Sequence, residues 1–269
     1  MSSGVLPVCV VTFDAPAGQL AQLQRSLDLA GRAIAPALAL HVVDHGAVSA
    51  WPRPPALRLP SQGNPGFAAG MNRLLRAAFA RPEVERALCL NPDAVLHPRA
   101  LAELLAVARD QPAALVEARQ FPEEHPKPYD PRTLETPWAS GACLLIPRST
   151  FAALGGFDER FFLYAEDVDL SWRAREAGYP VLHAPRALVG HPVQGRAADA
   201  SRERHLYLSA RALAAKWGHA RFRRWAEGRL LRAGLVGSRA DLPRLEPPAG
   251  RRSPAADFGH RLTFAQARW

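Results

Sequence analysis

The densest group of residues that could carry acid–base chemistry lies between Gly155 and Gly178. Five carboxylates fall within 12 residues there, among aromatic side chains: Asp158, Glu159, Glu166, Asp167 and Asp169. One interpretation is the solvated first turn of a helix, where the helix dipole favours acidic residues. The aromatic neighbours favour a partly enclosed carboxylate instead, and such a group can act as a general base toward a hydroxyl.

A second candidate site follows an apolar run at residues 87–90. Asn91 and Asp93 lie two positions apart there, so their side chains would point to the same side. A lone aspartate at such a place often only caps a turn or a helix. Beside a nucleoside diphosphate, however, the Asp93 carboxylate could hold Mg²⁺ or Mn²⁺, because such ions combine few protein carboxylates with phosphate oxygens.

The glycine-rich segment GNPGFAAG at residues 63–70 is a weaker signal. It lacks the Lys-Ser/Thr ending of a P-loop and the GxGxxG spacing. One interpretation is a helix start whose small residues allow close packing. The other is that Gly66 and its small neighbours let a ligand approach the backbone, while Asn64 and Asn72 offer amide hydrogen bonds.

Short apolar strands and longer amphipathic helices alternate through the first 110 residues. We expect strands at 8–13, 39–43, 57–59 and 87–90, and helices at 19–34, 67–80 and 98–109. This alternation predicts an α/β fold with a mainly parallel sheet and helices on both faces. Ligands of such sheets bind outside the carboxyl ends of the strands, so we expect the acids that follow three strands at that edge: Asp14, Asp44 and Asp93.

The pattern changes in the second half of the chain. We expect a loop at 121–137, a strand at 142–146, helices at 149–154 and 166–177, and extended pieces at 181–182 and 187–189 that lead to His191. Residues 199–235 have a helical pattern with a break at Gly218, and the last 30 or so residues are expected to be poorly ordered. The chain therefore divides into a domain at 1–195 and a helical basic extension at 196–269 with a poorly ordered end.

The carboxyl-terminal part carries the whole excess of positive charge. The chain has 34 cationic and 25 acidic residues, a net charge of +9, and only Lys127 and Lys216 among the cations are lysines. Residues 196–269 carry 16 cations against 6 acids, whereas residues 1–195 carry 18 against 19. A basic helix with Trp and Leu on another face suits an anionic membrane surface. Alternatively its apolar stripe packs on the rest of the protein while the arginines stay solvated, and both can hold together.

Cysteine usage and the amino terminus point to the cytoplasm. Cys9, Cys89 and Cys143 each lie in an apolar run without metal-ligand spacing, so we expect buried thiols in a reducing compartment. The amino terminus has no charged region before its short apolar run, and no stretch of about 18 apolar residues occurs. We therefore expect a cytoplasmic protein, peripheral at the inner face of the plasma membrane.

Six motifs in a fixed order carry a resemblance to a known family. They are VVTF, VVD, NPGFAAGMN, LNPDA, WASGACLLIPR and GGFDERFFLYAEDVDLSWR, followed by His191. Over residues 7–192 the chain resembles the family 2 glycosyltransferases of the GT-A fold, and among them the rhamnosyltransferase-like enzymes that build bacterial cell-surface polysaccharides. The resemblance implies a Rossmann-like, mainly parallel sheet flanked by helices.

The resemblance also implies a donor site and a metal site. Thr12 and Asp44 match positions that contact the nucleoside, and the segment from Asn64 to Asn72, with Gly66, matches the one beside the ribose and diphosphate. Asn91 and Asp93 occupy the DxD position, whose last aspartate meets the metal. His191 matches a histidine that completes the metal site in some members, and a neutral imidazole suits Mn²⁺. His191 could also be a structural histidine.

The catalytic base and the acceptor pocket follow in the same way. Asp167, in the pair Glu166-Asp167, matches the base, and Glu166 lies beside it in the substrate site. Trp138, Ser140 and Gly141 match the strand that lines the acceptor and donor-sugar pocket. The resemblance thus implies an inverting transferase dependent on Mg²⁺ or Mn²⁺ that moves a sugar from a nucleotide sugar, with dTDP-L-rhamnose as the candidate donor, to a glycan or lipid-linked acceptor.

The sequence departs from the family pattern in three places. Asn91 replaces the first carboxylate of DxD, which predicts loose metal binding that needs the nucleotide. Asp44-His45-Gly46-Ala47 replaces the usual Asp-Asn-x-Ser, and Asp14 replaces the usual Asn after the first strand. Arg173 is as suited to pairing with a helix carboxylate as with a diphosphate.

Two other classes of protein compete with the transferase. A nucleotidyltransferase needs a basic triphosphate-binding loop after the first strand, and the segment DAPAGQ has no Lys or Arg. A nucleic-acid or membrane binding module would act through the basic extension alone. The balanced charge of residues 1–195 argues against a nucleic-acid partner for the whole chain.

Overall fold

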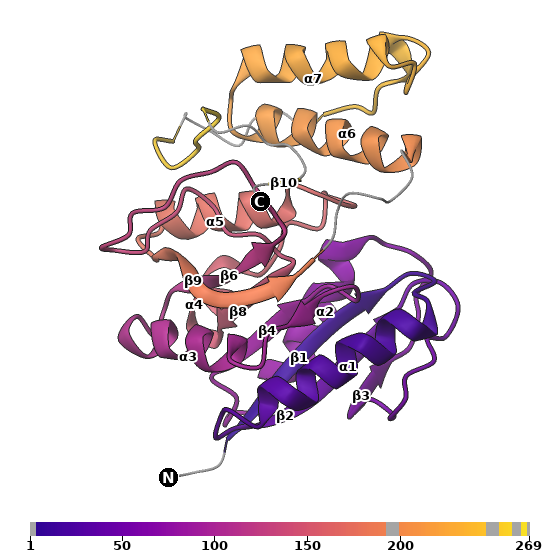
Figure 1. Cartoon of the computed structure of the whole chain (residues 1–269). Helices are drawn as coiled ribbons and strands as arrows, with labels where there is room; N and C mark the ends of the chain where they lie inside the picture. The colour runs from indigo at the N-terminus through magenta and orange to yellow at the C-terminus, as the bar shows by residue number, and fades with distance from the viewer. Residues whose placement is uncertain (1–3, 192–198, 246–252, 260–264, 268–269) are drawn as a thin grey trace.

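A central sheet of eight strands organises the protein (Figure 1). The computed structural model describes residues 4–191, 199–245, 253–259 and 265–267. The strands lie in the order β3-β2-β1-β4-β8-β6-β9-β5. Their bounds are β1 (Val5–Thr12), β2 (Ala37–Asp44), β3 (Leu57–Leu59), β4 (Arg86–Leu90), β5 (Val95–Leu96), β6 (Leu115–Phe121), β8 (Cys143–Pro147) and β9 (Val181–Gly190).

The strand directions bring the expected binding residues to one edge. β1 is parallel to β2 and β4, whereas β8 runs antiparallel to both β4 and β6, and β6 is parallel to β9. The carboxyl ends of β1, β2, β4, β6 and β9 therefore meet the amino end of β8. The predicted α/β fold with a mostly parallel sheet is confirmed, and β8 and β5 are its antiparallel members.

Helices cover both faces of the sheet because its central strands are apolar on both sides. In β1, Val8 and Val10 face a core that includes Leu23 of α1 (Ala17–Gly31) and Leu104 of α3 (Ala100–Asp110). The alternate residues of β1 face a second core, formed with α2 (Phe67–Phe79), α4 (Arg148–Leu154) and α5 (Glu166–Glu176). Cys9, Cys89 and Cys143 are free and buried, as predicted.

Two further helices stack on the outer side of α5, so that α5, α6 (Ala200–Lys216) and α7 (Ala220–Arg232) form successive layers in Figure 1. Trp172 of α5 is fully buried and lies edge-on to Trp217, with ring centroids 5.5 Å apart. Asp169 of α5, also fully buried, accepts hydrogen bonds from Lys216 Nζ and Trp217 Nε1. The apolar stripe of the basic extension thus packs on the rest of the protein, while Arg221, Arg223 and Arg224 of α7 are exposed.

Part of the end that we expected to be poorly ordered is packed. Phe258 lies 4.8 Å from Trp172 between ring centroids, and Arg175 donates to the carbonyl oxygen of Ala255. A short strand, β10 (Gln266–Ala267), pairs with β7 (Glu123–Glu124). Residues 246–252, 260–264 and 268–269 lie outside the described residues, as do residues 192–198, where we expected the boundary between the domain and its extension.

The strands β6 and β9 differ from the predicted elements for identifiable reasons. β6 was not expected, because its charged residues Glu117 and Arg119 interrupt the apolar pattern, yet Glu117 is only 2% exposed. The two extended pieces after residue 180 form one strand, β9, whose register against β6 jumps from Ala184 to Leu188. Pro185 lies in this irregularity, where a residue without an N–H is tolerated.

Among the described residues, no helix combines the length and apolarity that crossing a lipid bilayer requires.

Candidate active site

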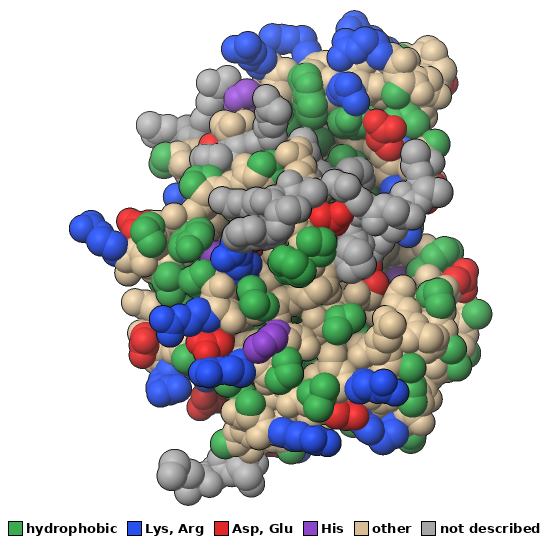
Figure 2. All heavy atoms as spheres, viewed as in Figure 1, with side chains coloured by type: hydrophobic (Ala, Val, Ile, Leu, Met, Phe, Trp, Pro, Cys, Tyr) green, Lys and Arg blue, Asp and Glu red, His purple; other side chains and the backbone are tan. Residues whose placement is uncertain are grey.

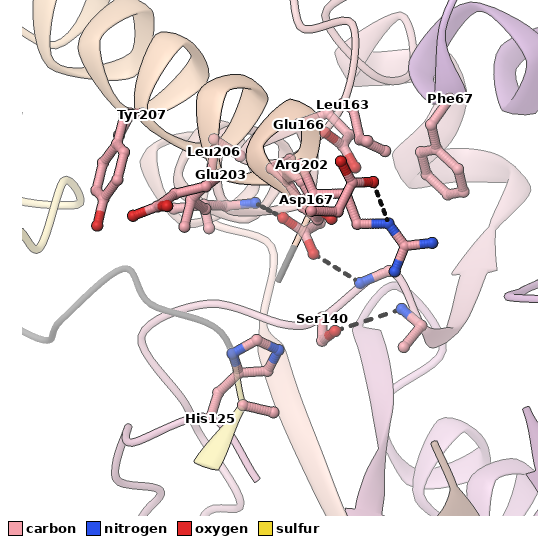
Figure 3. A pocket seen from close by; sticks show the side chains of 18 of the residues that line it. Phe67, His125, Ser140, Leu163, Glu166, Asp167, Arg202, Glu203, Leu206 and Tyr207 are labelled. Carbon is pink, nitrogen blue, oxygen red and sulfur yellow. Dashed lines mark hydrogen bonds and ion pairs between the residues drawn. The ribbon is translucent and has the colours of Figure 1, made fainter. Parts of the chain in front are cut away.

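A cavity of about 670 Å³ opens at the sheet edge where the strand ends meet. The ends of β4 and β9 contribute Asn91 and His191, and the segment before β8 contributes Trp138, Ser140 and Gly141. The first turn of α5 contributes Glu166 and Asp167, and one face of α6 closes the other side (Figure 3). Seven of the predicted site residues therefore line one cavity.

Two backbone amides hold the Asp167 carboxylate. Gly141 N–H donates to Oδ2 and Val168 N–H donates to Oδ1, each at 2.8 Å. The turn before α5 is unusual, because Tyr164 and Ala165 both have left-handed backbones, with φ of 71° and 66°. Such residues cost of order 1–3 kcal/mol each and cluster at functional sites. Desolvation raises the pKa of Asp167, with Gly141, Val168 and Lys127 acting in the opposite direction.

Glu166 is the more deeply buried of the pair, at 6% exposed. Its Oε2 atom has no hydrogen-bond partner among the described residues. Burial, and then the charge of Asp167, raise the pKa of Glu166 well above its ordinary value. The negative charge of Asp167 therefore disfavours ionisation of Glu166 beside it. This arrangement offers two neighbouring carboxyl groups to a ligand in the cavity.

His191 brings a ring nitrogen to the predicted metal position. Its Nδ1 lies 3.0 Å from Gln120 Oε1, so Nδ1 carries the proton and Nε2 carries the lone pair. Nε2 lies 3.1 Å from Asn91 Nδ2 and 3.3 Å from Asp93 Oδ1. Burial lowers the pKa of His191 to about 4, with Glu123 acting against it, so the imidazole is neutral near pH 7.

This donor set fits a divalent cation held together with a diphosphate. The buried, neutral His191 imidazole directs its Nε2 lone pair toward the Asp93 carboxylate, an arrangement that suits a metal ligand. The contact with Gln120 fixes the tautomer of this imidazole. Across the part of the chain that the structure describes, no cluster of three or more His, Cys, Asp and Glu could hold a metal. The protein alone thus offers two strong ligands, Asp93 and His191, and the other positions would go to phosphate oxygens and water.

Thr12 and Asp44 lie together at the ends of β1 and β2, outside the lining of the cavity. Thr12 Oγ1 and Ser49 Oγ each donate to Asp44 Oδ1 at 2.5 Å, and Arg58 pairs with Oδ2. Sequence reasoning missed Arg58, whose only signal was a charged residue in the middle of a three-residue strand. Burial raises the pKa of Asp44, and these partners outweigh it to lower the pKa.

The glycine-rich segment packs closely against its neighbours. Gly66 has φ of +94°, and a Cβ there would lie 2.3 Å from the carbonyl oxygen of Phe162, which accepts from Phe67 N–H at 2.8 Å. A Cβ on Gly70 would lie 2.4 Å from His45 Nε2. The small residues are therefore required for packing, whatever ligand they meet.

The two asparagines of this region differ in setting. Asn64 accepts a hydrogen bond from Gly66 N–H at 3.2 Å and is exposed. Asn72 is 1% exposed. Its Nδ2 donates hydrogen bonds to the Phe157 carbonyl oxygen and to the Glu159 carboxylate, and its Oδ1 accepts one from Phe157 N–H. Asn72 therefore holds the loop before α5. Arg173 pairs with Asp169, donates to the carbonyl oxygens of Leu154 and Gly156, and does not line the cavity.

A buried charge network supports the segment before β8, and sequence reasoning missed it. Glu117 Oε2 accepts from Ser140 N–H at 2.7 Å, and Glu117 Oε1 accepts from Lys127 Nζ and contacts His183 Nδ1 at 3.0 Å. Lys127 also donates to the Trp138 carbonyl oxygen and lies 4.2 Å from the Trp138 ring centroid. The signals were an acid inside an apolar run and one of only two lysines in an arginine-rich chain.

Comparison with known proteins supports a sugar-transferring enzyme. No family model matches the chain. It is 32% identical over 236 residues to the N-acetylglucosaminyl-diphospho-decaprenol L-rhamnosyltransferase of Mycobacterium tuberculosis, covering 70% of this chain and 76% of the relative. Among solved structures, the chain resembles the mannosyltransferase PcManGT from Pyrobaculum calidifontis in complex with GDP-Man and Mn²⁺. The TM-score is 0.58 at 18% sequence identity, and the match covers 87% of this chain and 76% of the mannosyltransferase chain. It also resembles GalNAc-T7 with UDP, GalNAc and Mn²⁺, with a TM-score of 0.56, 11% identity and coverage of 84% and 55%.

The two solved structures show the fold, and the mycobacterial relative shows the family. The sheet with its strand-end cavity is a GT-A fold, as predicted from the sequence. With 32% identity across three quarters of the relative, the chain belongs to the same glycosyltransferase family as the mycobacterial rhamnosyltransferase, and it is a glycosyltransferase.

Proposed function

We propose that this glycosyltransferase is an inverting enzyme of family 2 that transfers L-rhamnose from dTDP-L-rhamnose. Its acceptor would be N-acetylglucosaminyl diphospho-polyprenol, and its product an intermediate of bacterial cell-surface polysaccharide. The name of the mycobacterial relative supports the sugar and the acceptor. The observation that carries the reaction type is the Asp167 carboxylate, held by two backbone N–H groups within the cavity.

Asp167 is the general base of the proposed reaction. Its oxygens accept hydrogen bonds from Gly141 and Val168, which orient the carboxylate without neutralising it. An acceptor hydroxyl gives its proton to Asp167 while its oxygen attacks the anomeric carbon, and the bond from that carbon to the diphosphate breaks. A single displacement inverts the anomeric configuration. Glu166 lines the cavity beside the base.

Asp93 and His191, with Asn91 beside them, would hold Mg²⁺ or Mn²⁺ together with the diphosphate. Such an ion supplies positive charge that stabilises the leaving diphosphate. His191 keeps its lone pair available because burial prevents protonation near pH 7. Gln120 orients the ring by accepting from Nδ1, which is how outer hydrogen bonds tune metal-binding histidines.

The donor nucleoside would lie at the ends of β1 and β2, near Thr12 and Asp44. The segment from Asn64 to Asn72 would contact the ribose and diphosphate, with Asn64 exposed for a direct contact and Asn72 positioning the loop before α5. Trp138, Ser140 and Gly141 would line the sugar pocket. Trp138 lines the cavity, and its buried Nε1 has no hydrogen-bond partner among the described residues.

The basic extension would place the enzyme at the cytoplasmic face of the plasma membrane. α7 exposes Arg221, Arg223 and Arg224 beside Trp225, which is 38% exposed. Figure 2 shows Lys and Arg side chains gathered along the α7 end of the molecule. Arginines next to an interfacial tryptophan suit an anionic bilayer surface. Sedimentation with anionic rather than neutral vesicles at low salt tests this placement.

Donor specificity is the experiment that tests the proposal. Purified protein with Mn²⁺ is incubated with dTDP-L-rhamnose, UDP-glucose or GDP-mannose and the acceptor, and nucleotide release and product are measured. We expect turnover with dTDP-L-rhamnose and a thermal shift with dTDP. Turnover with another nucleotide sugar alone would overturn the rhamnose assignment. The absence of stabilisation by any nucleoside diphosphate would overturn the proposed donor site.

A further inference from the structure

The cavity that holds Asp167 continues beyond the reacting groups into an apolar arm. We define the apolar arm by Leu206, Tyr207 and Ala210 of α6, Trp225 of α7 and Leu235 after α7, all of which line the cavity. Leu206 and Tyr207 lie four and three positions before Ala210, so each shares a helix face with Ala210. In Figure 3, Tyr207 lies on the side of the cavity away from Asp167.

The residues of α6 that line the cavity change from charged to apolar along the helix. Its first turn presents Arg202 and Glu203, preceded by Asp199, whereas the next two turns present only apolar or aromatic residues. The cavity therefore passes from a base, to a single arginine among acids, to an apolar end. A ligand that fits this order has a sugar hydroxyl at one end and an apolar chain at the other.

The walls of the arm are held in place. Tyr207 is 8% exposed, its hydroxyl accepts from Arg229 Nε at 3.0 Å, and it packs with Leu230 and Val236. Its ring lies edge-on to Trp225, with centroids 5.7 Å apart. Trp225 is the outermost wall, and exposed Arg221 and Arg224 lie close to it on α7. The arm thus ends near the surface where the arginines gather.

We propose that the apolar arm binds the first isoprene units of a polyprenyl diphosphate acceptor. This inference rests on the proposed function and adds a site for the lipid part of that substrate. The charges of the cavity support it, because Arg202 already lies 3.4 Å from the Asp199 carboxylate and Glu203 is adjacent. An anionic diphosphate gains little in such surroundings, so affinity for the acceptor must come from burial of the chain. The rest of the chain leaves the arm past Trp225 toward the bilayer.

The test compares two acceptors that differ only in the lipid. Both are N-acetylglucosaminyl diphosphates, one joined to farnesyl and the other to ethyl, and both dissolve without detergent. Burial of a few methylene groups is enough for a tenfold change in affinity. We expect wild-type protein to have a KM for the farnesyl acceptor at least tenfold below that for the ethyl acceptor. Equal KM values would overturn the inference while leaving the proposed function intact.

Variants of residues in the apolar arm test whether the lipid chain of the acceptor binds there. Leu206→Asn and Trp225→Ala should each raise KM for the farnesyl acceptor about tenfold and leave kcat/KM for the ethyl acceptor unchanged. Leu29→Asn is the matched control, because Leu29 is a 41% exposed leucine on α1, away from the cavity lining. Unchanged farnesyl KM in both arm variants would overturn the inference. Ethyl-acceptor turnover shows that each variant is folded, and no transfer to either acceptor by wild-type protein would count against the proposed function instead.

Discussion

The backbone N–H of Gly141 donates a 2.8 Å hydrogen bond to Oδ2 of Asp167, and this contact joins two parts of the site. The segment that contains Gly141 is held from its other side by Glu117, which accepts from Ser140 N–H. The position of the proposed base therefore depends on the buried ion pair between Glu117 of β6 and Lys127. Removing a charge from that pair should therefore change the pKa of Asp167 without removing a residue that contacts the substrate.

Asp167→Asn should keep donor binding and lose transfer. Asparagine preserves the size of the side chain and cannot take a proton, so kcat should fall about 10³-fold, as for loss of a general base. The Kd for the nucleoside diphosphate, measured by calorimetry with metal present, should stay within twofold. Retained turnover would assign the base to another residue.

Lys127→Met should move the acid limb of the kcat profile to higher pH. The charge of Lys127 lowers the pKa of Asp167, while desolvation and Glu117 raise it. Without that charge, Asp167 accepts a proton at a higher pH and the rate begins to fall earlier as pH is lowered. The measurement is kcat against pH with saturating substrates.

Lys216→Met is the matched control for Lys127→Met. Lys216 is the other lysine of the chain and is also partly buried against carboxylates, namely Asp158 and Asp169. Its loss should destabilise the protein by about 3 kcal/mol, as for one partner of a buried ion pair. It should leave the acid limb in place, because it does not contact Asp167. Identical limbs in both lysine variants would contradict the assigned role of Lys127.

Glu117 should make the free energy of unfolding depend on pH in acid. Burial would raise its pKa, but Lys127 and His183 lower it to about 2, below the ordinary 4.5. A lowered pKa in the folded state gives stability that is present above about pH 4.5 and is lost as pH falls toward 2. The loss should reach about 3 kcal/mol. Urea unfolding at several pH values should show a shallower dependence for the double variant Glu117→Gln/Lys127→Met, and an unchanged slope would contradict this ion pair.

Asp93→Asn and His191→Ala should each weaken metal-dependent nucleotide binding. Removing a ligand or its support lowers metal affinity by about 10–100-fold. Titration of Mn²⁺ into protein with nucleoside diphosphate, followed by electron paramagnetic resonance, gives the Kd directly. Excess EDTA should abolish the thermal shift that wild-type protein shows with the nucleotide. A nucleotide shift that is insensitive to EDTA would contradict the metal site.

Sequence patterns predicted the site residues that follow the ends of strands and belong to recognisable motifs. His191 is far from Asn91 and Asp93 in the chain, and the order of the motifs still predicted the three residues at one metal position, where the structure brings them into contact. The parallel alternation of strands and helices also predicted the edge at which Thr12 and Asp44 meet.

The sequence could not predict which charged residues are buried in the folded protein. Glu117 and Lys127 each resemble surface residues, and only the pairing of β6 with β8 makes them a buried support for the site. Asn72 could equally have faced a ligand, and only tertiary contact shows that it holds the loop of Phe157. These residues depend on partners at least 10 positions away, which local patterns do not contain.

The anomeric configuration of the product tests the central claim most directly. Transfer from dTDP-L-rhamnose by wild-type protein is followed by nuclear magnetic resonance of the anomeric carbon and proton of the new bond. A single displacement assisted by Asp167 predicts a product with the configuration opposite to that of the donor, and no transfer in Asp167→Asn. A product that retains the donor configuration would contradict the proposed mechanism.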